Sequence, residues 1–190
     1  MYPSYKSIAK SLLLLCSVSF AHLTFGQSTA IDSILNGFGH LKLGDPKSKF
    51  ESQITLINGQ DTTDKAKYPF DYTYSGLRPE PTDPTIVTFR YFMIGFDKND
   101  QLSSLNYVTF YGDHPSMLPV RQERKDYQKL LQYFTEKTGQ SGTKVIYYQH
   151  KGKVVHEGYE WTNGDAVLKV DHYPNDKKRS SIGITLSKKS

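Results

Sequence analysis

Cysteine is almost absent from this sequence of 190 residues, in which Cys16 is the only example. Cys16 lies within the apolar run "IAKSLLLLCSVSFA" near the N-terminus, so a chain that loses this segment has no thiol. Without cysteine, disulfides, thiolate catalysis and cysteine-ligated metal sites are excluded. The domain must therefore be stabilised by its own core, and residues 27–190 are long enough to form one domain with such a core.

The sequence also lacks the common catalytic motifs. It contains no Gly-x-Ser-x-Gly, no phosphate-binding loop and no dinucleotide-binding glycine pattern. Glu157 and Glu160 fall on opposite faces of a predicted strand, so they do not form the carboxylate pair of a glycosidase. Asp97, Asn99 and Gln101 have calcium-loop spacing, but the required glycine and the final acid are missing, which favours a hairpin turn. We expect no catalytic residues and no cofactor.

The first 26 residues have the pattern of a signal peptide. Lys6 and Lys10 precede an apolar run that is too short to span a bilayer. Cleavage is expected after Gly26, which leaves Gln27 at the N-terminus, with Ala21 as the alternative site. The protein is thus predicted to be exported to the periplasm or the extracellular space, and no later segment is apolar enough for a transmembrane anchor. Leu15 precedes Cys16 where a lipoprotein signal requires a small residue, so lipidation is not expected.

Charge gives little indication of a nucleic-acid partner. The formal net charge is +5, and loss of Lys6 and Lys10 lowers it to +3. The remaining cations alternate with acidic residues, apart from short basic runs at 177–179 and 188–189. A concentrated basic stripe is typical of nucleic-acid binding and is not seen, so we predict a solvated surface and no nucleic-acid ligand.

The first half of the domain is predicted to contain a short helix and a long loop. Asp45 is an expected N-cap before Pro46, and Phe50, Ile54 and Ile57 recur at helical spacing. Residues 58–85 are rich in proline and acidic residues and form an expected irregular loop, with a short strand in "FDYTYSG". A loop of this length is either functional or partly mobile.

The second half is predicted to be mostly β-structure. The runs "TIVTFRYFMIGF" and "LSSLNYVTFYG" indicate a hairpin, and a helix is expected over 120–138 with Gly139 as its C-cap. Strands at 144–149, 154–161, 166–173 and 181–187 form an expected antiparallel meander. The predicted fold class is α+β, an antiparallel sheet of hairpin plus four-strand meander with two helices packed on one face.

The segment "FGHLKLGDPKSKF" carries a family resemblance through Leu41, Leu43, Gly44 and Phe50. It resembles the opening of small exported bacterial domains of the outer-membrane-assembly lipoprotein type and of the β-lactamase-inhibitor-protein-like fold. In these a helix pair packs against an antiparallel sheet. The Gly-Gln end of the leader and the tyrosine-rich strands resemble exported proteins of Bacteroidota. The resemblance implies a binding or assembly module without a catalytic set.

Aromatic residues are the most informative feature of the composition, with 14 Tyr and 10 Phe. Tyrosine suits protein interfaces and sugar rings, although it is also a good strand residue on a half-buried sheet. The predicted binding residues gather beside the long loop: Tyr68, Phe70, Tyr72, Tyr74 and Arg78. We expect an exported, non-catalytic module that contacts an envelope protein or a small ligand. The alternative is an envelope hydrolase or carbohydrate-active domain that uses carboxylates and histidines.

Two further features are interpreted as structural. His150 and His156 would share one face of adjacent strands if the intervening turn had three residues, but no third ligand follows at metal-site spacing, so no metal is expected. Asn163-Gly164 predicts a type I′ hairpin turn. Trp161 beside this turn is expected to pack against Leu168 and Val170 and to stabilise the fold.

Overall fold

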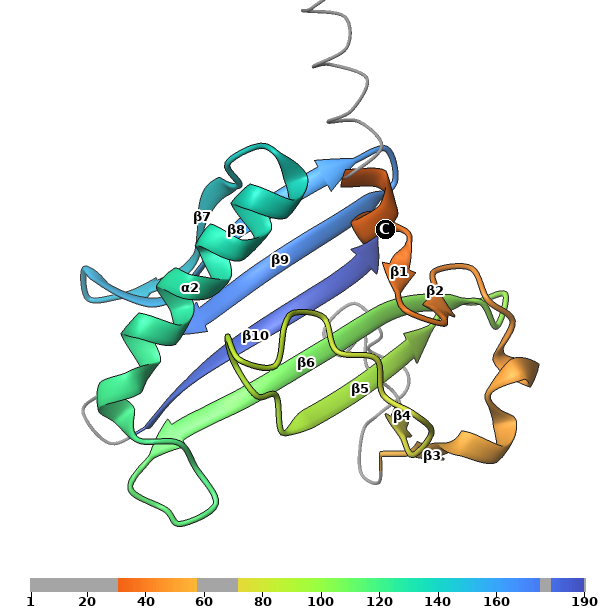
Figure 1. Cartoon of the computed structure of the whole chain (residues 1–190), viewed down its shortest axis with the longest axis horizontal. Coiled ribbons are helices and arrows are strands. Elements are labelled where there is room, and N and C mark those ends of the chain that lie inside the picture. Colours follow the sequence, from red (N-terminus) through yellow and green to blue (C-terminus); the bar gives the residue numbers. More distant parts are fainter. Residues whose placement is uncertain (1–30, 58–71, 175–178, 190) are drawn as a thin grey trace, which may run out of the picture.

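The computed structural model describes residues 31–57, 72–174 and 179–189. The signal-peptide prediction for residues 1–26 therefore lies outside the described residues, as do Tyr68 and Phe70. The described part is mostly β-structure, with one long α-helix (Figure 1). Among these residues no helix is both long and apolar enough to cross a membrane.

Eight strands form one antiparallel sheet in the order β3-β4-β5-β6-β10-β9-β8-β7. A separate two-stranded ribbon comprises β1 (Gly37–Phe38) and β2 (Leu41–Lys42). The bounds of the sheet strands are β3 Ile54–Leu56, β4 Tyr72–Tyr74, β5 Tyr91–Phe96, β6 Leu102–Gly112, β7 Thr143–His150, β8 Lys153–Asn163, β9 Ala166–Tyr173 and β10 Arg179–Lys188.

Long-range pairing of β6 with β10 joins the predicted hairpin and the predicted meander into one sheet. Tyr107 lies opposite Ile184, and the pairing runs along the length of both strands. The hairpin and the four meander strands are confirmed, but the first hairpin strand begins at Tyr91, and residues 85–90 of the predicted strand are not part of the sheet. The sequence did not reveal that they form one sheet. An apolar strand can pair with any of several strands distant in the sequence, and no local pattern shows which one it pairs with.

The predicted fold class, α+β with two helices packed on one face, is wrong, because the described residues are mostly β-structure with one long helix. The only described helix of seven or more residues is α2 (Val120–Thr138), which ends at Gly139 with φ of 70° as predicted. The segment predicted as a first helix forms two 3₁₀ turns, Lys47–Lys49 and Glu51–Gln53, and then β3. So short a helix is marginal in water, and the β-branched residues after Gln53 instead pair with β4.

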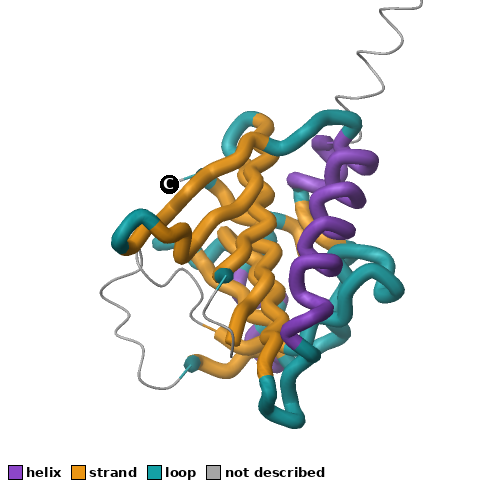
Figure 2. The backbone as a smooth tube through the Cα atoms, turned by 90° about the vertical axis from the view of Figure 1, so that its left-hand side faces the viewer, coloured by secondary structure: helices purple, strands orange, loops and turns teal. Residues whose placement is uncertain are grey.

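One face of the sheet is covered along its length. In Figure 1, α2 lies over β8, β9 and β10, while residues 75–90 cross over β5 and β6. Figure 2 views the sheet from its side, with α2 on one side of it. Phe134 of α2 packs against Trp161 at 5.8 Å between ring centroids, and Phe89 packs against Tyr107 at 5.9 Å. We call this side the covered face.

Strand alternation then assigns the other side chains to the opposite side, which we call the open face. Since Trp161, Leu168, Ile184 and Tyr107 point to the covered face, their strand neighbours point away from it. The open face therefore includes Tyr91, Phe110, His156, Lys169, Asp171, Tyr173, Arg179, Ser181 and Thr185.

The β8–β9 turn differs from its prediction by one residue. Asn163 pairs with Ala166, so Gly164 and Asp165 are the central residues. Gly164 has φ of 52°, whereas Asp165 has no positive φ. A glycine at the first central position is the pattern of a type II′ turn rather than type I′.

Candidate functional site

A shallow cavity of about 310 Å³ lies on the open face near the ends of β5, β6, β9 and β10. We call it the aromatic groove. Its described lining residues are Tyr91, Phe110, Met117, Tyr173, Arg179, Ser180 and Ser181. The rings of Tyr91, Phe110 and Tyr173 are exposed, at 49 %, 38 % and 43 %. Large aromatics usually lose most of their exposure on folding, so three exposed rings around one cavity indicate a contact surface.

The strand register fixes how the groove is built. Ser181 of β10 lies opposite Phe110 on one side and opposite Tyr173 on the other. These two aromatic residues thus stand two strand spacings apart, about 9 to 10 Å, with a small side chain between them. Tyr91 packs edge to face on Phe110 at 5.2 Å between centroids. The groove is therefore a small floor between two aromatic walls.

Tyr173 is held in place by a stack of three rings. His156 lies 3.9 Å from Tyr173 between centroids and nearly parallel to it, at 15°. Tyr147 covers the other face of the imidazole at 4.3 Å. The His156 Nε2 atom lies 3.3 Å from an Asp171 carboxylate oxygen. Because the imidazole is fixed from both faces and from its edge, the wall that it supports is rigid.

Polar side chains continue across the open face beside this stack. Asn106 Nδ2 donates to Thr185 Oγ1 at 3.2 Å, and Thr185 Oγ1 lies 3.5 Å from the second oxygen of Asp171. The Tyr147 hydroxyl donates to Glu160 at 2.8 Å, and Lys169 pairs with the same carboxylate at 3.2 Å. Donor and acceptor groups of both charges, Lys169 included, thus extend along the open face away from Arg179.

Tyr147 and Tyr173 of this face have raised pKa values. Burial raises the pKa of Tyr173, and the charge of Asp171 raises it further. Burial and the nearby Asp171 and Glu160 carboxylates likewise raise the pKa of Tyr147 well above its ordinary value. Both hydroxyl groups therefore act as uncharged hydrogen-bonding groups.

A second histidine cluster lies between α2 and the covered face. His172 is 8 % exposed and stacks on Tyr127 at 4.6 Å between centroids. Its Nε2 atom contacts Glu123, and its Nδ1 atom lies 3.6 Å from Glu157. Lys144 pairs with Glu157 at 2.9 Å. Since His172 and Glu123 are largely buried between the helix and the sheet, this cluster links α2 to the sheet rather than forms a ligand site.

The predicted binding residues that are described do not form one exposed surface. Tyr72 and Tyr74 point toward the covered face and pack on Phe96 and Phe50. The Tyr72 hydroxyl accepts a hydrogen bond from Lys47 at 2.8 Å. Arg78 pairs with Glu80 at 3.0 Å.

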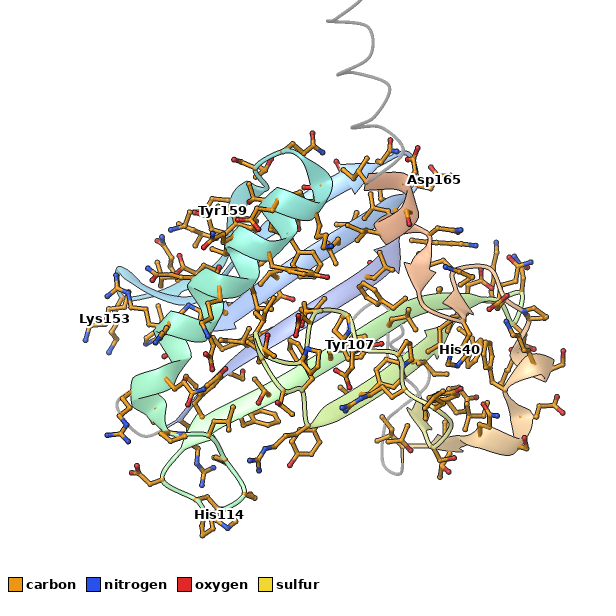
Figure 3. The ribbon with its side chains drawn as sticks, in the orientation of Figure 1. His40, Tyr107, His114, Lys153, Tyr159 and Asp165 are labelled. Atoms are coloured by element: carbon orange, nitrogen blue, oxygen red, sulfur yellow. The ribbon has the colours of Figure 1, made fainter. Side chains whose placement is uncertain are left out.

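Tyr74 does line a second cavity, of about 260 Å³, at the β3–β4 end of the sheet. Its hydroxyl lies 3.2 Å from the ring nitrogen of His40, which Figure 3 labels at that end of the molecule. Leu77, 83 % exposed, lies at the same cavity. This surface belongs to the described part of the predicted binding region and is accessible.

The two histidines considered for metal binding are separated by the turn geometry. The β7–β8 turn has two central residues, Lys151 and Gly152, not three. His150 therefore lies opposite Lys153 and contacts Tyr148, while His156 contacts Asp171. Across the described ranges, no three His, Cys, Asp or Glu side chains gather closely enough to hold a metal ion.

Sequence reasoning missed the aromatic groove. Tyr91, Phe110 and Tyr173 each belong to a strand that was predicted, and each alternates with core residues. That alternation could have marked them as facing away from the core. Their proximity depends on the β6–β10 pairing, which has no local signal in the sequence.

Comparison of the chain with protein-family models, curated proteins and solved structures finds no significant match.

Proposed function

We propose that the protein is an exported, non-catalytic binding module of the cell envelope that contacts its partner, an envelope protein or a small ligand, through the aromatic groove. The export and envelope location rest on the leader pattern of residues 1–26 and on the resemblance carried by Leu41, Leu43, Gly44 and Phe50. The absence of catalytic motifs from the sequence supports a role in binding.

The observation that carries the proposal is the exposure of three aromatic rings around one cavity on a rigid sheet. Tyr91, Phe110 and Tyr173 are each more than a third exposed, although their strands are otherwise well buried. Aromatic side chains are enriched at contact surfaces because they offer a large apolar area with few rotatable bonds. Strand-borne rings also lose little conformational entropy on binding.

The hydrolase alternative finds weaker support. A histidine that acts as a general base needs an accessible ring nitrogen beside the group that it deprotonates. His156 is stacked between Tyr173 and Tyr147 with its Nε2 atom against Asp171, and His172 lies beneath α2. We therefore assign both imidazoles to packing and do not propose a reaction.

Capture from an envelope extract on the immobilised domain tests the proposal, with bound proteins and small molecules both identified by mass spectrometry. The wild type should retain a species that Phe110→Ala loses. Ile146→Ala is the matched control, because Ile146 is 47 % exposed on the covered side of edge strand β7. Retention that is lost from Tyr74→Ala but not from Phe110→Ala would move the binding surface to the second cavity. Equal retention by all variants would contradict both surfaces.

A further inference from the structure

We infer that helix α2 docks the protein on a membrane surface that carries anionic lipid headgroups, through a row of cations on the outer side of the helix. This surface is separate from the aromatic groove, because α2 lies on the covered side of the sheet and the groove lies on the open face (Figure 2). The inference goes beyond the proposed function and does not depend on what the groove binds.

The helical period separates charges that are mixed in the sequence. Residues 121–129, "RQERKDYQK", contain four cations and two acids. The structure turns both acids inward. Asp126 is 1 % exposed and accepts a hydrogen bond from the Tyr111 hydroxyl at 3.0 Å. Glu123 contacts His172 beneath the helix. A segment with mixed charges in the sequence therefore presents only positive charge to solvent.

The first half of α2 exposes only cations and amides. The exposed side chains of residues 120–132 are Arg121, Gln122, Arg124, Lys125, Gln128, Lys129 and Gln132. Arg121, Lys125 and Lys129 recur every four residues, so they form one row about 12 Å long on the helix surface, with Arg124 beside it. Within the described residues none of these four cations enters an ion pair. We call these four residues the basic row.

The basic row does not stabilise the helix that carries it. Like charges four residues apart on a helix repel each other. Arg121 also lies in the first turn of α2, where the positive end of the helix macrodipole disfavours a cation. A helix face that served only for solubility would gain stability from opposite charges at this spacing. The row is therefore better explained by an anionic partner than by the stability of the fold.

The composition of this surface favours a membrane over an acidic protein. Protein interfaces have an apolar core from which charged residues are depleted. Among residues 120–132, all of which are described, no apolar side chain is exposed, so the outer side of α2 offers no such core. An anionic membrane needs none, because each Lys or Arg near its surface adds an electrostatic attraction. With α2 against the lipid, the aromatic groove faces away from the membrane and stays accessible.

Co-sedimentation of the domain of residues 27–190 with lipid vesicles tests the inference. Vesicles of equal parts of phosphatidylcholine and phosphatidylglycerol supply the anionic surface, and vesicles of phosphatidylcholine alone supply a neutral one. We expect binding to the anionic vesicles at low ionic strength and little binding to the neutral ones. Salt at about 1 M shortens the screening length to about 3 Å and should release the protein.

A triple variant, Arg121→Gln with Lys125→Gln and Lys129→Gln, tests the basic row itself. Each basic residue near an anionic membrane is worth roughly a fivefold change in binding, so this variant should bind on the order of a hundredfold more weakly. Glutamine is a good helix former, so α2 should be preserved, and circular dichroism checks that it is.

The matched control removes the same number of charges elsewhere, through Lys98→Gln, Lys151→Gln and Lys189→Gln. These exposed lysines lie in the β5–β6 turn, in the β7–β8 turn and after β10. The net charge falls equally in both triple variants, but the control keeps the basic row and should bind nearly as the wild type does.

Several results would overturn the inference. Absence of binding to the anionic vesicles at low ionic strength, or equal binding to neutral vesicles, would exclude an electrostatic membrane contact. Equal loss in the two triple variants would show that net charge is recognised rather than the basic row. Binding to a duplex DNA without binding to vesicles would assign the row to a different polyanion. None of these results bears on the aromatic groove, which the Phe110→Ala capture experiment tests separately.

Discussion

Two aromatic residues of neighbouring strands, Trp161 and Tyr173, show how position on a strand decides what a ring does. Trp161 points to the covered face, is 2 % exposed and donates its indole N–H to the Gln140 carbonyl at 2.9 Å. Tyr173 points to the open face and is 43 % exposed. The sequence prediction that Trp161 is structural is confirmed by its burial, and its predicted neighbour Leu168 lies directly opposite it.

Trp161→Ala should destabilise the domain by about 3–5 kcal/mol, because it leaves a cavity beside Phe134 and removes the hydrogen bond to Gln140. Urea denaturation followed by circular dichroism measures this loss. Tyr148→Ala serves as the comparison, because Tyr148 is 54 % exposed and its loss should cost less than about 1 kcal/mol. A Trp161→Ala domain of unchanged stability would contradict its structural role.

Gly158 is required by the close approach of the Val170 carbonyl oxygen and the Tyr147 ring. A Cβ atom there would lie 2.7 Å from the Val170 carbonyl oxygen and 3.1 Å from the Tyr147 ring. Gly158→Ala should therefore destabilise the domain by about 1–3 kcal/mol and displace Tyr147 from His156. Thermal unfolding of the variant checks the stability, and the His156 proton shifts in NMR spectra check the displacement.

Gly183 provides the matched control for that substitution. A Cβ atom on Gly183 would meet its nearest neighbour at 3.5 Å, an ordinary contact. Gly183→Ala should therefore change stability by less than about 1 kcal/mol. If both alanine variants behaved alike, the close approach of the Val170 carbonyl oxygen and Tyr147 to Gly158 would not be a constraint on the fold.

At the scale of elements, helix α2 is attached to the sheet by apolar packing and by one charged cluster. The hydrogen bond from Lys144 lowers the pKa of Glu157 below its ordinary value of 4.5, and contacts with His172 lower it further against the effect of burial. A carboxyl with a lowered pKa in the folded state favours folding when ionised. Its contribution is present above about pH 4.5 and is lost as the pH falls through the folded pKa.

Glu157→Gln should thus lower the free energy of unfolding at pH 7, and this difference should shrink as the pH is lowered below 4.5. Urea denaturation at a series of pH values measures both curves. Glu136→Gln is a suitable control, since Glu136 lies on the exposed side of α2 and accepts a hydrogen bond from Gln132 one helical turn away. A difference that stayed constant with pH would show that the Lys144–Glu157 pair does not contribute through its charge.

Elements with a strong local pattern were predicted well. Helix α2 has an apolar stripe over several turns and a glycine at its end, so its bounds of 120–138 are confirmed. After Pro46, only Phe50, Ile54 and Ile57 have the spacing of an apolar helix face. This pattern is too short to stabilise a helix, and residues 54–56 instead pair with β4. The short strand expected in "FDYTYSG" is confirmed as β4.

At the scale of the whole molecule, a single pairing of distant strands creates the candidate site. Phe110 on β6 and Tyr173 on β9 come together because β10 inserts between their strands. Alternation along each strand is encoded locally, whereas the order of strands in the sheet is decided by the collective packing of the core. The sequence therefore predicted the strands but not the groove, and it directed attention instead to the residues around Tyr74.

Binding at the aromatic groove can be tested by NMR mapping of small fragments on the assigned domain of residues 27–190, an experiment that works whichever ligand the groove takes. Fragments that contain a ring should shift the signals of Tyr91, Phe110, Tyr173 and Ser181 together and leave Trp161 unchanged. Shifts confined to His40, Tyr74 and Leu77, or no clustered shifts on the open face, would contradict a binding role for the groove.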